Sequence, residues 1–256
     1  MQLSVVIITH NEEANIGRTL TSVQSLVSDG KGEVIVVDSG STDRTVEIAK
    51  SFGAKVFVEE WKGFAAQKNS VIDKATGDWI LSLDADEEVS RELAQELSKL
   101  SGTEPPQAYL LPRKNFFLGR WIKHGGYWPD PKLRLFRKGA ASFEARKVHE
   151  DARLRSGIAA RLHQPLIHHS YPTLSDYIEH MNRYSSLGAE MAVAQGKRGS
   201  VIDIVLRPWA TFVYNYFFRL GFLDAREGLL LHLYHAVYVS WKYAKTWELG
   251  RTGSGR

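Results

Sequence analysis

LSLDADEEV, residues 81–89, changes from apolar to acidic within one short stretch. Four acids close it: Asp84, Asp86, Glu87 and Glu88. Carboxylates that lie close together repel one another, and each is more stable in water than in a protein interior. The apolar part, taken with the residues before it, predicts a buried strand over residues 78–86. The acids therefore mark either a solvated strand end or a place where a positive partner binds.

Predicted strands and predicted helices alternate along the chain on either side of this strand. Apolar runs predict further strands over 3–9, 33–38 and 55–60. Helical spacing of apolar residues predicts helices over 15–27, 45–52, 65–75 and 90–100. Such alternation forms βαβ units around a mainly parallel sheet, which binds ligands at the carboxyl ends of its strands. We therefore expect a ligand-binding edge where Thr9, Asp38 and Asp84 end three strands, and we expect Ser90 to cap the last helix.

The remaining chain changes character after a linker, GTEPPQ, at residues 102–107. We expect a βαβ region over 1–104, an extension of the same domain by short strands over 105–170, and a helical region over 171–256. The predicted fold class is α/β, a Rossmann-like mixed sheet flanked by helices, with a C-terminal helical appendage rich in aromatic residues.

Composition and charge narrow the possible classes of protein. The chain has 256 residues and no cysteine, which excludes a disulfide framework and fits a reducing compartment. MQLSVVIITHNEE has no basic n-region and no small-residue cleavage site, so we expect no signal peptide. The net charge of the chain is +4, but the charge is unevenly distributed. Residues 1–104 have a net charge of −8, and residues 105–161 have a net charge of +9. The acidic part suits a metal, and the basic part suits an anionic partner.

The D-x-D pair predicts a metal site. Alternate residues of an extended chain face the same side, so Asp84 and Asp86 are expected to lie close together. Hard cations such as Mg²⁺ or Mn²⁺ prefer oxygen ligands and often share them with a substrate diphosphate. The alternative is an ordinary solvated strand end.

Asp38 and His10 follow the other strand ends. The Asp38 carboxylate is suited to accept the imide N–H of a pyrimidine or to bind ribose, while Asp43 fits a structural cap better. His10 either stacks beneath a base or packs in the loop. No G-x-G-x-x-G, G-x-x-x-x-G-K-[ST] or G-x-S-x-G motif is present, which argues against a dinucleotide dehydrogenase, a P-loop enzyme and an α/β-hydrolase.

Four segments carry a resemblance: ITHNEE at 8–13, VVDSGSTD at 36–43, AAQKN at 65–69 and LSLDADE at 81–87. In this order and spacing, over residues 3 to about 100, the chain resembles family 2 of the inverting glycosyltransferases, which have the GT-A fold. The resemblance implies a nucleotide diphosphate sugar donor, usually a UDP-sugar, with Mg²⁺ or Mn²⁺ on its diphosphate. It implies a nucleoside pocket lined by Ile8, Thr9, His10, Glu12 and Asp38. It also implies that Lys68 lies near the nucleotide, that Asp84 contacts ribose or metal, and that Asp86 is the direct metal ligand.

The catalytic base is expected after the basic segment. Transfer with inversion needs a carboxylate that takes the proton of the attacking hydroxyl. Glu150, in KVHED, is our prediction, with His149 orienting it and Asp151 as the rival. The alternative is a surface acid in a charged turn.

GGYWPDPKLRLFRK, residues 125–138, is expected to bind the acceptor. Tyr127 and Trp128 are suited to stack on a sugar, and the glycines suggest a loop that is mobile or closely approached. Lys132, Arg134 and Arg137 are expected to alternate along a strand, to share a face and to bind phosphates. The alternative is an edge strand protected by positive charge.

This stretch, the following VHE and HHSYPTLSDYIEHMNRYS (168–185) resemble the branch of family 2 that contains lipopolysaccharide-core β-glucosyltransferases. The resemblance implies transfer of glucose to an inner-core heptose. The Q-x-x-R-W pattern of processive polysaccharide synthases is absent, which favours transfer of a single sugar.

Two apolar, aromatic runs lie in the C-terminal region, at 205–223 and 228–245. A helix that crosses a membrane needs ~20 mostly apolar residues, and charged residues, histidines or proline interrupt both runs. Trp and Tyr beside Arg and Lys suit a helix that lies on a membrane surface. The alternative is a helical hairpin that packs on the catalytic domain or in a dimer.

Together these features predict a metal-dependent inverting glycosyltransferase that moves one hexose, glucose from UDP-glucose, onto an anionic glycolipid such as lipopolysaccharide inner core. We expect it in the cytoplasm, peripheral on the inner face of the cytoplasmic membrane, with no nucleic-acid partner. One alternative keeps the fold and makes the acceptor a polyprenyl phosphate. A remoter one is a non-catalytic module that binds sugar nucleotides or nucleic acid.

Overall fold

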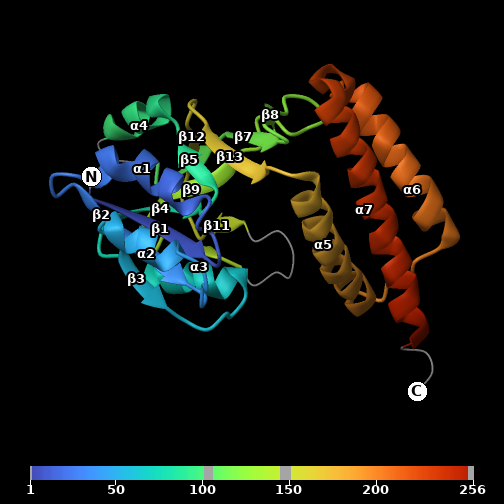
Figure 1. Ribbon diagram of the computed structural model, residues 1–256, viewed down its shortest axis with the longest axis horizontal. Helices are drawn as coiled ribbons and strands as arrows, with labels where there is room; N and C mark the ends of the chain where they lie inside the picture. The colour runs from blue at the N-terminus through green and yellow to red at the C-terminus, as the bar shows by residue number, and fades with distance from the viewer. Residues whose placement is uncertain (1, 101–105, 145–150, 253–256) are drawn as a thin grey trace. The chain divides into compact units, whose positions relative to one another are not determined.

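The computed structural model of the protein describes residues 2–100, 106–144 and 151–252. A seven-stranded mixed sheet forms the centre of its N-terminal part (Figure 1). The chain divides into two compact units. Unit 1 comprises Met1–Arg113 and Asp130–His168, and unit 2 comprises Lys114–Pro129 and His169–Arg256. The α/β fold class expected from the sequence is confirmed.

The strand order of the large sheet in unit 1 is β12-β6-β9-β4-β1-β2-β3. Its strands are β1 (Leu3–Thr9), β2 (Gly32–Asp38), β3 (Lys55–Val58), β4 (Trp79–Asp84), β6 (Ala108–Leu111), β9 (Lys132–Arg137) and β12 (Ala159–Arg161). β1 to β4 run parallel, and β9 is antiparallel to both β4 and β6. The four N-terminal strands therefore end at one edge, as the βαβ pattern predicted.

Helices cover both faces of this sheet because its strands are apolar on both sides. α1 (Ile16–Val27), α2 (Thr45–Ser51) and α4 (Arg91–Ser98) pack on the face that contains Val5 and Ile7. α3 (Phe64–Asp73), with the short strands β10 (Ala141–Phe143) and β11 (Ala152–Leu154), packs on the face that contains Val6. Ile7 is fully buried, so its truncation to alanine is expected to cost about 2–5 kcal/mol.

The strand predicted over 78–86 is shorter than expected. β4 ends at Asp84, Ala85 and Asp86 form a turn, and a new strand, β5 (Glu87–Val89), begins directly afterwards. β5 pairs antiparallel with the first half of β13 (Leu166–Tyr171), so that His168 lies opposite Glu87. The extended conformation expected to continue through Asp86 was therefore wrong, because a turn follows Asp84, although the two carboxylates are still close enough for the charge of Asp84 to act on Asp86.

Unit 2 combines a hairpin with a helical bundle. β7 (Arg113–Phe117) and β8 (Arg120–Trp121) form the hairpin. α5 (Leu174–Ala194), α6 (Val201–Val213) and α7 (Ala225–Thr252) pack side by side (Figure 1). Between α6 and α7 lie a π-helical turn, η1 (Tyr214–Phe218), and a 3₁₀ turn, η2 (Gly221–Asp224).

Local sequence explains the helix starts. Thr173 with Asp176, and Ser200 with Asp203, form capping boxes at α5 and α6. Ser90 caps α4 through the backbone N–H of Leu93, as the sequence predicted. Among the described helices, none combines the length and apolarity needed to cross a bilayer.

Candidate active site

The strand register brings the predicted edge residues together. Thr9, the last residue of β1, lies opposite Asp38, the last residue of β2. On the other side of β1, Ile8 lies opposite Asp84, the last residue of β4. Polar residues from three distant segments therefore line one edge of the sheet.

Side chains tie the loops after β1 and β2 to each other. The Asn11 N–H donates to the Ser41 hydroxyl at 2.8 Å, and the Asn11 Oδ1 atom accepts the Thr42 N–H at 2.8 Å. Asn11 has a φ of 54°, a left-handed conformation that asparagine tolerates better than most residues. The Glu12 N–H donates to the Thr45 hydroxyl at 2.7 Å. These bonds hold the edge in one conformation.

Asp38 is buried, with its carboxylate engaged by the turn that follows it. One oxygen accepts the N–H groups of Gly40 and Ser41 at 2.9 and 2.8 Å, and the other accepts the Ser41 hydroxyl at 2.5 Å. Gly40 has a φ of +84°, which suits glycine. The contact of Asp38 with a nucleoside stays a prediction. Asp43 accepts the Thr45 N–H at 3.0 Å, a structural role of the expected kind.

Glu12 and His10 occupy different environments at this edge. Burial raises the pKa of Glu12, and nearby Asp86 raises it further, although the Asn15 amide opposes this shift by donating to the carboxylate at 2.9 Å. His10 is exposed, with its Nε2 atom 3.3 Å from the Asn11 amide nitrogen. An exposed imidazole here is compatible with stacking on a base.

Asp84 lies between two cations of the protein itself. The Lys68 ammonium, on α3, donates to one carboxylate oxygen at 2.6 Å, and the Arg134 guanidinium donates to the other. Burial by itself raises the pKa of Asp84, but Arg134 and Lys68 together hold it well below the usual value. Asp84 is therefore ionised, and its charge is compensated from within unit 1.

Glu87 extends this contact into a buried network. Its carboxylate accepts Arg134 Nη2 at 2.7 Å and Arg113 Nη1 at 3.0 Å, and Arg113 also binds Asp130 at 2.6 Å. The Glu87 side chain is fully buried and that of Arg134 is 6% exposed. Asp84 and Glu87 thus meet buried arginines, and Glu88 lies 3.9 Å from the more exposed Arg18, which is how a row of carboxylates is accommodated here.

A β-bulge aims Arg134 at these acids. Along the β6–β9 pair, Tyr109 lies opposite Leu135 and Leu110 opposite Leu133, so Arg134 is the extra residue. A shared face for Lys132, Arg134 and Arg137 was wrong: Arg137 is three residues from Arg134, which puts the two on opposite faces of a regular strand, and the bulge at Arg134 also interrupts the alternation with Lys132. The Arg137 guanidinium lies over the Trp79 ring at 5.5 Å, and the Lys132 ammonium lies 3.1 Å from the Asp151 carboxylate.

His168 is a site residue that the sequence analysis did not single out. Its Nε2 atom lies 3.2 Å from Asp86 Oδ2. Burial by itself raises the pKa of Asp86, but His168 outweighs this and lowers it. The only signal in the sequence was the HHSY motif, whose pairing with β5 depends on the fold.

The donor set at Asp86 fits a divalent ion in part. Among the described residues, no group of three or more His, Asp and Glu side chains has the arrangement of a complete metal site. Asp86 and His168 supply one carboxylate and one imidazole, ligands that Mn²⁺ and Mg²⁺ accept to different degrees. An ion held by two protein ligands keeps further positions for diphosphate oxygens and water. The residues therefore fit a metal that is shared with a substrate.

Three buried polar atoms near the carboxyl edge lack hydrogen-bond partners within the described chain: Thr9 Oγ1, Ser39 Oγ and Gln67 Nε2. Thr9 and Ser39 lie at the ends of β1 and β2, and Gln67 precedes Lys68 on α3. Buried polar groups are nearly always paired in folded proteins, so unpaired ones at a strand edge indicate a polar ligand or ordered water.

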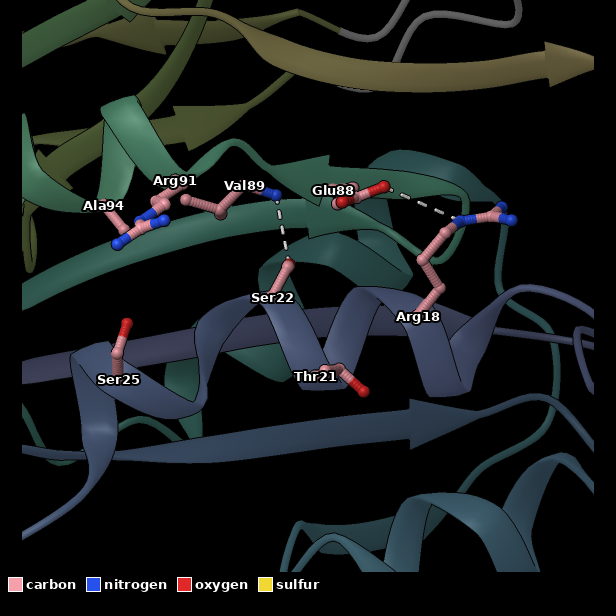
Figure 2. Close-up of a pocket in the computed structure, with 8 residues that line it drawn as sticks. All are labelled: Arg18, Thr21, Ser22, Ser25, Glu88, Val89, Arg91 and Ala94. Atoms are coloured by element: carbon pink, nitrogen blue, oxygen red, sulfur yellow. Dashed lines mark hydrogen bonds and ion pairs between the residues drawn. The ribbon is translucent and has the colours of Figure 1, made fainter. Parts of the chain in front are cut away.

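A separate pocket of about 380 Å³ lies along α1, between that helix and the β5–α4 segment (Figure 2). Its lining comprises Arg18, Thr21, Ser22, Ser25, Glu88, Val89, Arg91 and Ala94. Ser22 accepts the Val89 N–H at 3.0 Å, and Arg18 lies 3.9 Å from Glu88. None of the residues predicted to bind nucleotide lines this pocket.

The two aromatic residues predicted to bind the acceptor belong to the other unit. Tyr127 and Trp128 belong to unit 2, where Tyr127 packs against its core and Trp128 stands edge-on to Trp121. Gly125 has a φ of +66°, and a Cβ there would lie 2.0 Å from His232, so this loop is closely approached. Glu150 and His149 lie outside the described residues.

Comparisons with known protein sequences show the family to which the chain belongs. A family model described as "Glycosyl transferase family 2" matches residues 4–162. A Rickettsia typhi protein named "Uncharacterized glycosyltransferase RT0209" is 33% identical over 97% of this chain and 87% of its own length. The "Lipopolysaccharide core biosynthesis glycosyltransferase LpsC" of Rhizobium meliloti is 27% identical over 97% of this chain and 93% of its own length.

Solved structures agree on the fold. The mannosyltransferase PcManGT of Pyrobaculum calidifontis, in complex with GDP-Man and Mn²⁺, has a TM-score of 0.55 at 16% identity, covering 95% of this chain and 86% of that one. TarS 1–349 of S. aureus, in complex with UDP, has a TM-score of 0.52 at 17% identity, covering 99% and 92%. Both the family match and the fold lead to one assignment: the chain is a glycosyltransferase of family 2 with the GT-A fold.

Proposed function

We propose that this enzyme is a metal-dependent inverting glycosyltransferase that moves a single hexose, glucose from UDP-glucose, onto an anionic glycolipid such as lipopolysaccharide inner core. The observation that carries the proposal is the Asp86–His168 pair, which follows the carboxyl end of β4. The name of the Rhizobium relative, a lipopolysaccharide core glycosyltransferase, supports the acceptor class. The complexes of the structural neighbours with UDP and with GDP-Man and Mn²⁺ support the donor class and the metal.

The strand edge supplies the donor site in this proposal. Asp86 and His168 would hold Mg²⁺ or Mn²⁺, with Asp84 as a second metal or ribose contact, and a bound ion would supply positive charge for the departing diphosphate. Lys68 and Arg134 keep Asp84 ionised and fixed in position. Ile8, Thr9, His10, Glu12 and Asp38 line the nucleoside pocket.

Glu150 acts as the base in this proposal. It takes the proton from the acceptor hydroxyl while that oxygen forms a bond to the anomeric carbon. The bond from the anomeric carbon to the diphosphate oxygen breaks on the opposite face, so the configuration inverts. Tyr127, Trp128 and Lys132 are proposed to contact the acceptor.

The outer face of α6 supports action at the inner face of the cytoplasmic membrane. Large apolar side chains are exposed there: Val201, Ile202, Val205, Leu206 and Trp209. Their spacing places them on one stripe of the helix, with Trp209 near its middle, while Arg207 lies on the opposite side, over the Tyr243 ring of α7 at 5.1 Å. An exposed apolar stripe that contains Trp suits a helix lying in the headgroup region of a bilayer.

A donor screen tests the proposal. Purified protein is incubated with a panel of nucleotide sugars and Mn²⁺ or Mg²⁺, and release of free nucleoside diphosphate is measured. We expect slow, metal-dependent hydrolysis of UDP-glucose by the natural chain and about 10²–10³-fold slower hydrolysis by Asp86→Asn. Absence of turnover with every donor, together with no stabilisation of the fold by UDP and Mn²⁺, would overturn it.

A further inference from the structure

Two lysines of unit 2 lie over one tryptophan ring. The Lys114 ammonium lies 4.7 Å from the centroid of the Trp121 ring, and the Lys123 ammonium lies 4.5 Å from it. Lys114 is on β7, Trp121 ends β8, and Lys123 follows closely. Each contact is a cation–π interaction, in which the ring face attracts a positive charge.

No carboxylate of the described chain lies within ion-pair distance of either ammonium group. Neither Lys114 nor Lys123 forms an ion pair within residues 2–100, 106–144 and 151–252. By contrast, Lys55, Lys68 and Lys74 of unit 1 each bind a carboxylate within 2.7 Å. Two like charges gathered on one neutral ring, without a carboxylate, leave a local excess of positive potential that favours an anion.

The backbone holds this cluster in place. The N–H groups of Lys123 and His124 both donate to the buried Asp224 carboxylate, at 3.1 and 2.8 Å to its Oδ2 atom. The hairpin turns through Leu118 and Gly119, which have φ values of 50° and 78°, and Phe116 pairs with Trp121 across it. The side chains therefore start from a fixed scaffold, which lowers the entropy cost of binding a ligand.

A second indole adds apolar surface. Trp128 stands edge-on to Trp121, with ring centroids 5.3 Å apart and an interplanar angle of 86°. Both rings are only partly buried. Aromatic faces pack on the apolar C–H surface of a sugar, so the cluster offers one surface for a saccharide and two ammonium groups for its charge.

Chain connectivity links this cluster to the donor edge. The segment that carries it, Lys114–Pro129, leaves unit 1 directly after Arg113 and returns at Asp130. Arg113 and Asp130 bind each other at 2.6 Å, and Arg113 also binds Glu87, the residue after Asp86. The two residues that flank the segment in the chain, Arg113 and Asp130, thus belong to the buried network of unit 1.

We propose that Lys114, Trp121, Lys123 and Trp128 form a binding site for a phosphorylated saccharide, the anionic part of the acceptor. Calling this ligand the acceptor rests on the proposed transferase function. Binding of a phosphorylated saccharide at this site does not depend on whether the protein hydrolyses a sugar donor. The sequence analysis expected Arg134 and Arg137 to bind phosphate, but their guanidinium groups contact Asp84 and the Trp79 ring inside unit 1. The proposal assigns phosphate binding to Lys114 and Lys123 instead, which have no acidic partner among the described residues.

Indole NMR of the full-length protein tests binding directly. Protein labelled with ¹⁵N-tryptophan is titrated with glucose 6-phosphate, with glucose and with inorganic phosphate, and the Trp121 signal is assigned by its loss in Trp121→Phe. We expect glucose 6-phosphate to shift the Trp121 signal at concentrations where glucose and phosphate do not. The double variant K114Q/K123Q should weaken this binding about ten-fold, because two charge-assisted contacts are lost.

Lys50→Gln is the matched control, because Lys50 is an exposed lysine of unit 1. It should leave the titration unchanged, and thermal unfolding in the presence of UDP and Mn²⁺ checks that each variant is folded. An unchanged affinity in K114Q/K123Q overturns the proposal, as does an equal response to inorganic phosphate, which indicates an adventitious ion only. If donor hydrolysis is absent while the Trp121 shift persists, the transferase proposal fails and the binding site stands.

Discussion

His168 and Asp86 come together at 3.2 Å although β13 and the β4–β5 turn are far apart in the sequence. The pairing of β5 with β13 creates this contact, since His168 lies opposite Glu87 in the register. In the proposed function these two side chains hold the metal, so both can be tested against the metal dependence of the reaction.

Replacement of Asp86 by asparagine should lower donor hydrolysis by about 10²–10³-fold, because a charged ligand at the leaving diphosphate is lost. His168→Gln should instead raise the Mn²⁺ concentration needed for half-maximal activity by at least about ten-fold. A Mn²⁺ titration of nucleoside diphosphate release measures both. His163→Gln is the control, since His163 is an exposed histidine that binds Glu96. Wild-type metal dependence in His168→Gln would contradict the assignment.

Arg134→Met should destabilise the fold strongly. The substitution leaves Asp84 and Glu87 without their shared cation, and breaking a buried ion pair costs about 3–5 kcal/mol. Urea unfolding at neutral pH measures the change. Arg44→Met, which removes an exposed arginine paired with Glu47, should change the free energy of unfolding by less than about 1 kcal/mol. A similar small effect at both positions would show that the network does not stabilise unit 1.

Glu150→Gln separates the two acceptor hypotheses. If Glu150 is the base for a sugar hydroxyl, transfer should fall by about 10²–10⁴-fold. A polyprenyl phosphate acceptor is already anionic and needs little help from a base, so the variant would then keep most of its rate. Asp151→Asn serves as the comparison, because Asp151 is exposed and lies beside Lys132. Transfer kinetics with each acceptor class give the answer.

His232 predicts a pH dependence of stability. The side chain is buried, neither ring nitrogen has a partner among the described residues, and burial, followed by His235 and Arg219, lowers its pKa to about 4. The unfolded chain binds a proton near pH 6.5, so it holds more protons than the folded chain between about pH 6.5 and 4. Stability should therefore fall as the pH is lowered through this window, by about 1.4 kcal/mol per unit at most.

Urea unfolding of the natural chain and of His232→Asn at a series of pH values tests this. Asparagine does not titrate, so the variant should lose less stability between pH 6.5 and 4 than the natural chain. His235 has a lowered pKa for the same reason, burial, and should account for part of the dependence that remains. Parallel pH profiles for the two proteins would rule out His232 as a source.

The apolar stripe of α6 predicts binding to anionic vesicles. Trp209→Glu should weaken co-sedimentation with phosphatidylglycerol-containing vesicles more than ten-fold, because a large apolar contact becomes a charge that the bilayer repels. Trp61→Glu is the matched control, since Trp61 is an exposed tryptophan of unit 1. Equal binding of both variants would exclude α6 as the contact, and a concentration-dependent increase in mass would favour a dimer interface instead.

The sequence was sufficient to predict which residues end the strands at the sheet edge, but not which charged side chains pair with them. Continuous apolar runs located β1, β2 and β4, and helical spacing located the helices, because each pattern depends on neighbours in sequence. The cation that Arg134 supplies to Asp84 depends on a bulge, which a regular alternation does not anticipate. His168 reaches Asp86 only through pairing between distant strands, so no local pattern could identify it.

The pairing of Asp84 with Lys68 and Arg134 has a consequence for the order in which ligands bind. Because that carboxylate is already neutralised, the free enzyme offers a divalent ion little net negative charge, and most of the attraction must come from the nucleotide's own phosphates. Cation and donor should then enter as one complex, each strengthening the binding of the other, and the empty enzyme should hold the ion only weakly.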